Sequence, residues 1–251
     1  MTSGHLKRSD TFATLNDGTP PAANSRLIES LKGGLIVSCQ APDQHPFRDP
    51  EVIARLADCA ALGGAVAVRV NSPRDIRAVR KQCSLPVIGL HKMPIGHRSV
   101  ITPTFALAKG LVDAGADIVA IDFTDESPGD PAGLAAAIHQ ELGQLVMADV
   151  STLDEGLKAW ASGADLVGTT LAGYTQAQLP TPDEPNVDLV QKLSEAGVRV
   201  VAEGRYRNQE DLAAAFDRGA WAVVVGGAIT NPVAITSRLV RATPKAKSGW
   251  R

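Results

Sequence analysis

The sequence predicts an α/β fold, a single (β/α)8 TIM barrel, and three observations lead to this class. Short apolar runs rich in β-branched residues alternate eight times with amphipathic stretches. The starts of these runs lie about 27 residues apart, which is the size of one βα unit. The chain has 251 residues, a length that single barrels commonly have. An open doubly wound sheet is the alternative, but no GxGxxG motif follows the first apolar run.

Each apolar run is nearly continuous, as in parallel strands that helices bury on both faces. Because aromatic residues make up only 4% of the chain, the core must be built from Val, Ile, Leu and Ala. The stretches between the runs have a helical apolar stripe; over 51–62, Val52, Ile53, Leu56 and Ala60 share one face. We therefore expect strands over 34–40, 65–70, 86–92, 118–123, 145–150, 166–171, 198–204 and 222–228.

A repeated Gly-Ala pair supports this number of strands. Directly before the second, fourth, sixth and eighth expected strands the chain reads GGA, GAD, GAD and GAW. A glycine at such a point can end the preceding helix in the left-handed conformation without steric cost. A repeat in every other unit over eight units is typical of a (β/α)8 barrel.

The two ends of the chain differ from the periodic part. Residues 1–25 are rich in Thr, Ser, Asn, Gly and Pro and lack the apolar segment of a signal peptide, so we expect a disordered leader. Residues 26–241 form the predicted barrel domain, and residues 242–251 are expected to be a flexible tail.

Composition and charge exclude several classes of protein. The formal net charge of -2 is not the basic balance of a nucleic-acid binder. The apolar runs are much shorter than the roughly 20 residues that cross a bilayer. The three cysteines have neither CxxC nor zinc-like spacing. We expect a cytoplasmic protein with no metal site that contacts neither nucleic acid nor membrane.

Polar side chains stand where the expected strands end, which is the face of a barrel that carries active sites. Each such side chain costs free energy in a buried position unless it is paired or solvated. Salt bridges at the barrel mouth would explain individual members, but a polar residue on almost every strand indicates a site. The set is Gln40, Arg69, Lys92, Asp122, Asp149, Thr169, Thr170, Glu203 and Arg205.

Glycines after the last two strands predict a phosphate site. The turn GGA at 226–228 precedes a helix and can present backbone N–H groups to an anion. Gly204 and Arg205 follow the seventh strand, where the arginine can supply a countercharge. A phosphorylated substrate is therefore the better prediction, with phosphate-binding residues Gly204, Gly226, Gly227 and Ala228.

Lys92 and Glu203, at the ends of two different strands, form a candidate acid/base pair. Desolvation at the end of an apolar strand disfavours the ammonium and makes a neutral lysine attainable. Such an amine can remove a carbon-bound proton or form a Schiff base. Arg69 or Gln40 can hold an enolate or carbonyl oxygen. Two reaction classes fit: epimerisation or isomerisation beside a carbonyl, and Schiff-base aldol cleavage.

Linked sequence blocks at these strand ends carry a family resemblance that runs from about residue 31 to 241. The blocks are GLIVSCQA (34–41), IGLHK (88–92), MADVSTLDEG (147–156), GTTLAGYT (168–175), VAEGR (201–205) and VVVGGAIT (223–230). Together they resemble the N-acetylmannosamine-6-phosphate 2-epimerases of sialic-acid (N-acetylneuraminate) catabolism. The resemblance implies a barrel isomerase that converts N-acetyl-D-mannosamine 6-phosphate to N-acetyl-D-glucosamine 6-phosphate without a metal or redox cofactor.

The resemblance also implies roles for individual residues. Lys92 matches the catalytic lysine of the family and Glu203 its catalytic glutamate. Thr170 and Tyr174, at and after the sixth strand, are further candidates for the substrate pocket. A homodimer through exposed helices would fit this fold class. The positions that match substrate-contacting residues of the family are Gln40, Arg69, Asp149 and Arg205.

Two segments depart from the family pattern. The family usually has arginines after the fourth strand, in a segment like DATxRxRP, whereas this chain has the acidic segment DFTDESPGD at 122–130. The family also usually reads AITRP after the eighth strand, and here Asn231 replaces the arginine. Arg98 and Arg207 are candidates to compensate. The alternatives are a divergent member acting on an unphosphorylated or modified N-acyl hexosamine, a Schiff-base aldolase, and a non-catalytic sugar-phosphate-binding protein.

Overall fold

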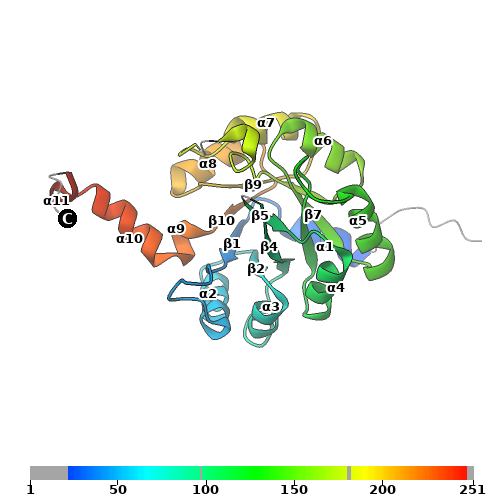
Figure 1. The fold of residues 1–251 in the computed structure, drawn as a ribbon, viewed down its shortest axis with the longest axis horizontal. Coiled ribbons are helices and arrows are strands. Elements are labelled where there is room, and N and C mark those ends of the chain that lie inside the picture. Colours follow the sequence, from blue (N-terminus) through cyan, green and yellow to red (C-terminus); the bar gives the residue numbers. More distant parts are fainter. Residues whose placement is uncertain (1–21, 97, 180–181, 248–251) are drawn as a thin grey trace, which may run out of the picture.

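The computed structural model describes residues 22–96, 98–179 and 182–247, and eight parallel strands in this part of the chain close into a barrel (Figure 1). β10 pairs with β1 and closes the ring. The predicted fold class is confirmed. In spatial order the strands are β1 (Leu35–Cys39), β2 (Ala67–Asn71), β3 (Val87–Leu90), β6 (Ile118–Asp122), β7 (Leu145–Asp149), β8 (Leu166–Gly168), β9 (Val200–Glu203) and β10 (Ala222–Val225).

Seven helices surround the strands. Directly before each of them stands a polar residue whose side chain accepts a backbone N–H of the first turn. Such N-caps satisfy donors that have no partner within the helix. In α6, Thr152 and Glu155 form a complete capping box. The helices are α2 (Pro50–Leu62), α3 (Pro73–Arg80), α4 (Phe105–Asp113), α5 (Pro131–Ala137), α6 (Leu153–Ala161), α7 (Val187–Glu195) and α8 (Gln209–Asp217).

The Gly-Ala repeat has the conformation that the sequence predicts. Gly64, Gly115, Gly163 and Gly219 follow α2, α4, α6 and α8 with φ of 88°, 106°, 91° and 85°. These angles lie in the left-handed region, which glycine enters at little cost. Each glycine therefore ends a helix and turns the chain towards the next strand.

The core has two parts because side chains alternate along each strand. One part, with Val68 and Val146, packs between the strands and the helices. The other fills the barrel interior with residues such as Ile36, Ile88 and Met147. Cys39 belongs to the outer part and is fully buried, and burial raises the pKa of its thiol to about 12. It is a packing residue, as the strand alternation predicts.

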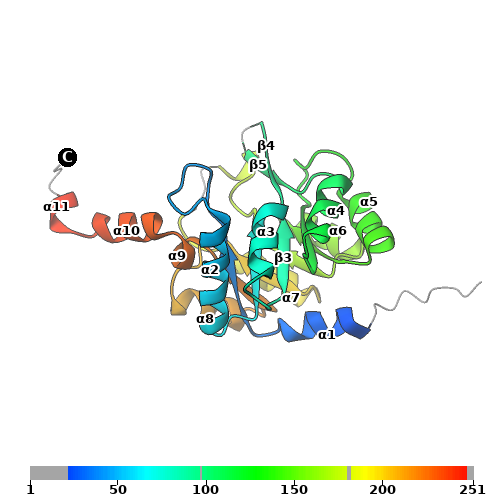
Figure 2. The same cartoon turned by 90° about the horizontal axis from the view of Figure 1, so that it is seen from below.

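The two ends of the barrel are covered differently (Figure 2). α1 (Ala22–Ser30) lies across the end where the strands begin, and the hairpin β4 (Lys92–Ile95) and β5 (Arg98–Ile101) rises at the opposite end. Residues 22–25, which we assigned to the leader, are the first turn of α1; residues 1–21 lie outside the described part. The expected third strand, 86–92, is also too long, because Lys92 begins the hairpin.

The chain continues after β10 with α9 (Gly227–Thr230), α10 (Pro232–Arg241) and α11 (Pro244–Lys247). Residues 244–247 are thus helical rather than part of an irregular tail. α10 extends away from the barrel and buries none of its residues (Figure 1). Two shorter turns complete the elements, a π-helical turn over Ile138–Leu142 and a 3₁₀ turn over Gln176–Gln178. No helix in the described ranges is both long and apolar enough to cross a membrane.

Candidate active site

The inward-pointing positions above the apolar layers of the barrel carry polar side chains. On β2, Arg69 is two residues beyond the interior residue Ala67, and on β7, Asp149 is two residues beyond Met147. These positions therefore point to the same side as the apolar interior, at the carboxyl ends of the strands. The alternation places six side chains in this layer: Ser38, Arg69, Asp122, Asp149, Thr170 and Glu203.

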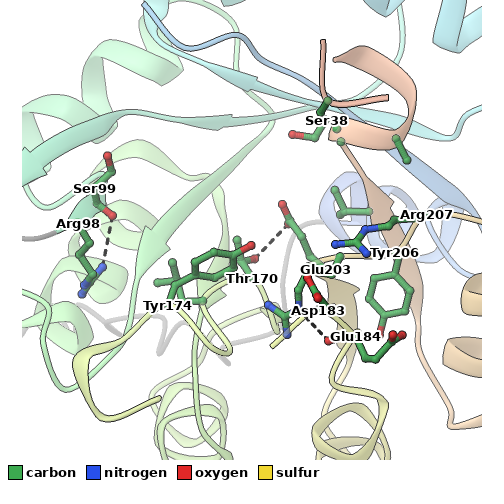
Figure 3. A pocket seen from close by; sticks show the side chains of 18 of the residues that line it. Ser38, Arg98, Ser99, Thr170, Tyr174, Asp183, Glu184, Glu203, Tyr206 and Arg207 are labelled. Carbon is green, nitrogen blue, oxygen red and sulfur yellow. Dashed lines mark hydrogen bonds between the residues drawn. The ribbon is translucent and has the colours of Figure 1, made fainter. Parts of the chain in front are cut away.

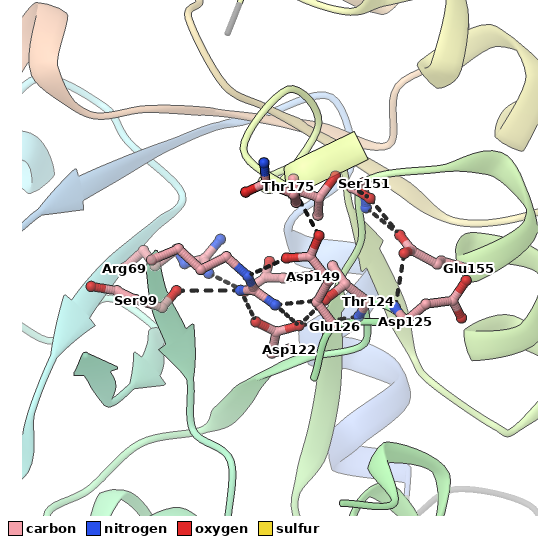
Figure 4. Close-up of polar contacts among 12 residues, drawn as sticks. Arg69, Ser99, Asp122, Thr124, Asp125, Glu126, Asp149, Ser151, Glu155 and Thr175 are labelled. Atoms are coloured by element: carbon pink, nitrogen blue, oxygen red, sulfur yellow. Dashed lines mark hydrogen bonds and ion pairs between the residues drawn. The ribbon is translucent and has the colours of Figure 1, made fainter. Parts of the chain in front are cut away.

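Arg69 is the centre of this layer, and its side chain is 1% exposed. Its Nη2 forms an ion pair with Asp149 Oδ2, and its Nη1 forms one with Glu203 Oε2 (Figure 4). Nη1 also donates to Thr170 Oγ1 at 3.0 Å. Burial alone would lower the pKa of Arg69, but the two carboxylates raise it above its usual range. The guanidinium is therefore a fixed positive charge beneath the site.

Asp149 is fully buried behind Arg69 and does not reach the cavity. Burial raises its pKa to about 6, while the charge of Arg69 and a hydrogen bond from Thr170 oppose this shift. Thr170 Oγ1 lies 2.5 Å from Asp149 Oδ1. The network needs Gly168, because a Cβ there would lie 2.8 Å from Asp149 Oδ1 and 2.9 Å from Thr170 Oγ1.

Glu203 connects this buried network to the cavity. Its backbone N–H donates to Thr169 Oγ1 at 3.0 Å, and Thr169 Oγ1 donates to the Glu203 carbonyl at 2.9 Å. Arg69 and Thr170 hold carboxylate oxygen Oε2, whereas Oε1 has no hydrogen-bond partner among the described residues. The side chain is 14% exposed and lines the cavity. One oxygen is thus anchored and the other is free to meet a ligand.

Lys92 lies on the cavity wall as the first residue of β4. Its backbone N–H donates to Asn71 Oδ1 at 2.9 Å, which holds the start of the hairpin against β2. Burial of the amine lowers the pKa of Lys92, and the charge of Arg69 lowers it further, whereas Glu203 and Asp149 act in the opposite direction. The residue as a whole is exposed because the cavity is open, so water moderates this effect. The direction of the shift favours a neutral amine.

The cavity at the mouth of the barrel has a volume of about 1010 Å³ (Figure 3). It is large enough for a sugar phosphate, since small-molecule sites measure roughly 300–1,000 Å³. Its wall brings together nine of the residues that the sequence predicts for the site. They are Lys92, Thr170, Tyr174, Glu203, Gly204, Arg205, Gly226, Gly227 and Ala228.

The turn after β10 has the geometry of an anion site. Gly226 precedes α9, whose first N–H groups have no partner within the helix. A Cβ on Gly226 would lie 3.2 Å from Ser38 Cβ, so the close contact with β1 favours glycine. Thr230 Oγ1 donates to the Ser38 carbonyl at 2.8 Å and fixes α9 on β1. This turn therefore presents donors to the cavity from a rigid support.

Arg205, just after β9, lines the same cavity and has a strained backbone conformation, with φ of 66°. Its Nε donates to the Glu184 carbonyl at 2.7 Å and its Nη1 to the Ala172 carbonyl at 2.8 Å. The guanidinium carbon is 5.6 Å from the centre of the Tyr174 ring. Arg205 therefore keeps its charge at the cavity but uses two of its N–H groups to hold loops.

Gln40 is, with Arg69 and Asp149, one of three predicted substrate-binding residues that do not line the cavity. Its Nε2 donates to Ser38 Oγ at 2.8 Å. Its Oε1 is buried without a hydrogen-bond partner. Ser38, which does line the cavity, was missed by the sequence reasoning although it is the inward-pointing residue two positions before Gln40.

A second cluster explains the acidic segment 122–130 (Figure 4). Arg98, on β5, pairs with Asp122 at 2.5 Å and with Glu126 at 3.1 Å, and donates to Thr124 Oγ1 at 2.8 Å. Thr124 Oγ1 also lies 2.6 Å from Asp122 Oδ1. The acidic side chains therefore hold the hairpin on the loop after β6. In the described part of the chain, no group of His, Cys, Asp and Glu residues could hold a metal ion.

A closed parallel barrel whose mouth holds a cavity with a lysine, a glutamate and a glycine turn has the arrangement of a TIM-barrel enzyme. The chain belongs to the family described as "NanE: Putative N-acetylmannosamine-6-phosphate epimerase", whose model matches residues 53–245. The resemblance that the motifs predict is thereby confirmed.

Individual relatives agree with this membership. A protein of Klebsiella pneumoniae subsp. pneumoniae is 48% identical over 79% of this chain and 84% of its own length. One of Glaesserella parasuis is 41% identical over 89% of this chain and 96% of its own. Both are named "Putative N-acetylmannosamine-6-phosphate 2-epimerase". The solved N-acetylmannosamine-6-phosphate 2-epimerase of Clostridium perfringens has a TM-score of 0.82 at 33% identity, over 97% of this chain and all of that chain.

Proposed function

We propose that this protein interconverts N-acetyl-D-mannosamine 6-phosphate and N-acetyl-D-glucosamine 6-phosphate. The observation that carries the proposal is the placement of Lys92 and Glu203 on one cavity, above a buried arginine and beside the glycine turn. The names of the family and of the Clostridium perfringens structure support the same reaction.

Glu203 acts on the hydroxyl at carbon 1. In the closed sugar ring the hydrogen on carbon 2 is not acidic, so the ring must open before epimerisation. The unpaired Oε1 of Glu203 can accept the proton of this hydroxyl, since Oε2 is held by Arg69 and Thr170. As the proton leaves, the bond between carbon 1 and the ring oxygen breaks, and the ring oxygen takes up the proton that Glu203 accepted, which restores the carboxylate. The products of this step are an aldehyde and a free hydroxyl.

Lys92 then acts on carbon 2. Its neutral amine takes the proton, and the electron pair of the broken C–H bond moves towards the aldehyde oxygen to form an enolate. Rotation about the bond between carbon 2 and carbon 3 then turns the other face of the enolate towards Lys92, and its ammonium returns a proton there, which gives the epimer and restores the neutral amine. The fixed positive charge of Arg69 stabilises the negative charge of the enolate near Glu203, although Arg69 itself is buried beneath the cavity surface. Gln40, with its free buried oxygen, is a candidate to orient the acetamido group through Ser38.

The phosphate is bound at the turn after β10. Gly226, Gly227 and Ala228 present backbone donors, and Gly204 with Arg205, after the neighbouring strand β9, lines the same cavity. Phosphate at a helix start between glycines is a common arrangement in barrels of this type. No cofactor is needed for this chemistry, since both steps are proton transfers.

Proton NMR of N-acetylmannosamine 6-phosphate in deuterated water tests the proposal. We expect the epimer to appear together with loss of the carbon 2 proton signal as deuterium enters. Turnover of free N-acetylmannosamine at a comparable rate would contradict the phosphate assignment. Covalent trapping of Lys92 by borohydride with substrate would instead favour a Schiff-base aldolase.

The assembly and location of the enzyme are further proposals. Val233, Leu239 and Val240 on α10 are at least half exposed, and none of the residues of this helix is buried. We infer that these side chains are covered in a homodimer. Free Cys39, Cys59 and Cys83 suit a reducing cytoplasm. Sedimentation would test the homodimer.

A further inference from the structure

Positive charge exceeds negative charge on the wall of the large cavity. Six lysine and arginine residues line it, against three acidic residues, Asp183, Glu184 and Glu203. A wall with this imbalance attracts an anionic ligand. The cations are Lys92, Arg98, Arg205, Arg207, Arg238 and Arg241.

The family pattern has an arginine at position 231, where this chain has an asparagine that cannot supply the charge. Asn231 Oδ1 caps α10 by accepting from the Ala234 N–H at 2.9 Å, and it lies 3.0 Å from His45 Nε2. His45 Nδ1 accepts from the Phe47 N–H at 3.0 Å, so the neutral ring donates its remaining proton to Asn231. The side chains at 45 and 231 are thus occupied with each other.

Two other candidate cations are also engaged. Arg98 makes ion pairs with Asp122 and Glu126 and is 8% exposed, so its charge is neutralised. Arg205 keeps its charge, but its Nε and Nη1 donate to backbone carbonyls. Arg98, which the sequence suggested as a compensating residue, therefore holds the hairpin instead.

Besides Lys92, three cations remain, and Arg241 Nε donates to the Ser237 carbonyl of its own helix at 3.4 Å. Within the described residues, the guanidinium groups of Arg207 and Arg238 have no hydrogen-bond or ion-pair partner. Both line the large cavity, where Arg207 is drawn among the wall side chains (Figure 3), and both line an adjoining cavity of about 340 Å³. Asp211, beside them, uses its Oδ2 to accept the backbone N–H of Arg207 at 2.7 Å. Their charges are therefore free for a ligand.

We propose that Arg207, with Arg238 of α10, supplies the countercharge for the phosphate of the substrate, in place of the arginine absent at position 231. The planar guanidinium can donate two parallel N–H groups to phosphate oxygens, which a neutral asparagine cannot do. The glycine turn at 226–228, with its backbone N–H groups, lines the same cavity. This inference rests on the proposed function and assigns residues to its phosphate site.

The test compares Arg207→Gln and the double variant Arg207→Gln/Arg238→Gln with the wild type. Arg55→Gln is the matched control, since Arg55 is exposed on α2 and lines neither cavity. For N-acetylmannosamine 6-phosphate, we expect KM to rise about ten- to hundredfold in Arg207→Gln, the range for a lost charged hydrogen bond, with kcat little changed. The double variant should have a still higher KM. Calorimetry with N-acetylglucosamine 6-phosphate should show the same order of affinities.

The outcomes separate this inference from the proposed function. If the wild type epimerises the sugar phosphate and both variants keep the KM and affinity of Arg55→Gln, the assignment of Arg207 and Arg238 is wrong while the function stands. If the wild type binds the sugar phosphate without converting it, the proposed function fails and the affinities of the variants still decide the inference. If the wild type does not bind the sugar phosphate, both are wrong.

Discussion

Two clusters at the mouth of the barrel have nearly the same composition and different positions relative to the cavity. Each has a buried arginine, two carboxylates and a threonine: Arg69 with Asp149, Glu203 and Thr170, and Arg98 with Asp122, Glu126 and Thr124. The Arg69 cluster has one carboxylate oxygen free at the cavity and a lysine nearby. The Arg98 cluster joins a hairpin to a loop.

The difference teaches that a buried arginine between carboxylates does not by itself mark a catalytic centre. Such groups also hold elements together, as Arg98 does between β5 and the loop after β6. Two features distinguish the Arg69 cluster. One carboxylate oxygen of Glu203 has no hydrogen-bond partner among the described residues, and the pKa of the neighbouring Lys92 is lowered. The following variants should separate the two roles.

Replacement of Lys92 by Met should have the largest effect. Removal of the base should lower carbon 2 exchange by about 10²- to 10⁴-fold, the usual contribution of general acid/base catalysis. Proton NMR in deuterated water measures this exchange. Lys109→Met is the control, because Lys109 pairs with Asp113 on the outer helix α4. Exchange at the wild-type rate in Lys92→Met would show that another group removes the proton.

Arg69→Met should destabilise the fold more than any change in the second cluster. It leaves Asp149 as a fully buried carboxylate without its cation, which typically costs about 3–5 kcal/mol of unfolding free energy. Denaturant unfolding measures this loss. The double variant Arg69→Met/Asp149→Asn should recover part of it, since the uncompensated charge is removed. A double variant as unstable as the sum of the two single variants would contradict this explanation.

Arg98→Met should have a smaller effect on stability. Asp122 loses its cation but keeps hydrogen bonds from the Thr124 N–H at 3.1 Å and Thr124 Oγ1 at 2.6 Å. We expect a loss of about 1–3 kcal/mol, as for an incompletely satisfied polar group. Carbon 2 exchange should fall far less than in Lys92→Met. A variant that folds stably but loses all exchange would give the Arg98 cluster a direct role in catalysis.

The pH dependence of carbon 2 exchange should differ least between the wild type and a variant, Glu203→Gln, but the difference is the most specific. Exchange requires the neutral amine of Lys92, so it should rise with pH until the lowered pKa of Lys92 is passed, below the ordinary value of 10.5. Glu203 raises this pKa. In Glu203→Gln the rising limb of residual exchange should therefore move to lower pH. A limb that moves to higher pH would show that Glu203 does not act on Lys92 in this way.

The sequence predicted the fold and nine of the residues on the cavity wall, because both follow from regular patterns. Apolar runs at steady intervals indicated the strands, and strand ends in a barrel must meet at one face. The family membership was predicted from blocks such as GTTLAGYT and is confirmed by the family model. The catalytic roles of Lys92 and Glu203 and the contacts to substrate stay predictions.

The features that were missed depend on contacts between distant segments. The hairpin β4–β5 has no alternating pattern long enough to indicate two strands, and its pairing is visible only in three dimensions. The partner of Asp122 is Arg98, 24 residues away, and nothing in the sequence distinguishes it from other arginines. The burial of Asp149 beneath Arg69 also depends on packing across three strands, so the sequence assigned it to the substrate.

The hairpin has a consequence for how this enzyme can change in evolution. Glu203 belongs to a barrel strand that pairs on both sides, so its position is fixed by the whole ring. Lys92 belongs to the β4–β5 hairpin, whose strands pair only with each other among the described residues. The hairpin is attached at its base through Asn71 and Thr102, and through Arg98 to the loop after β6. Insertions and substitutions in the hairpin can therefore change the position of the Lys92 amine relative to a bound sugar while the barrel stays intact. New substrate preferences in this family should arise in the hairpin sooner than in the strands.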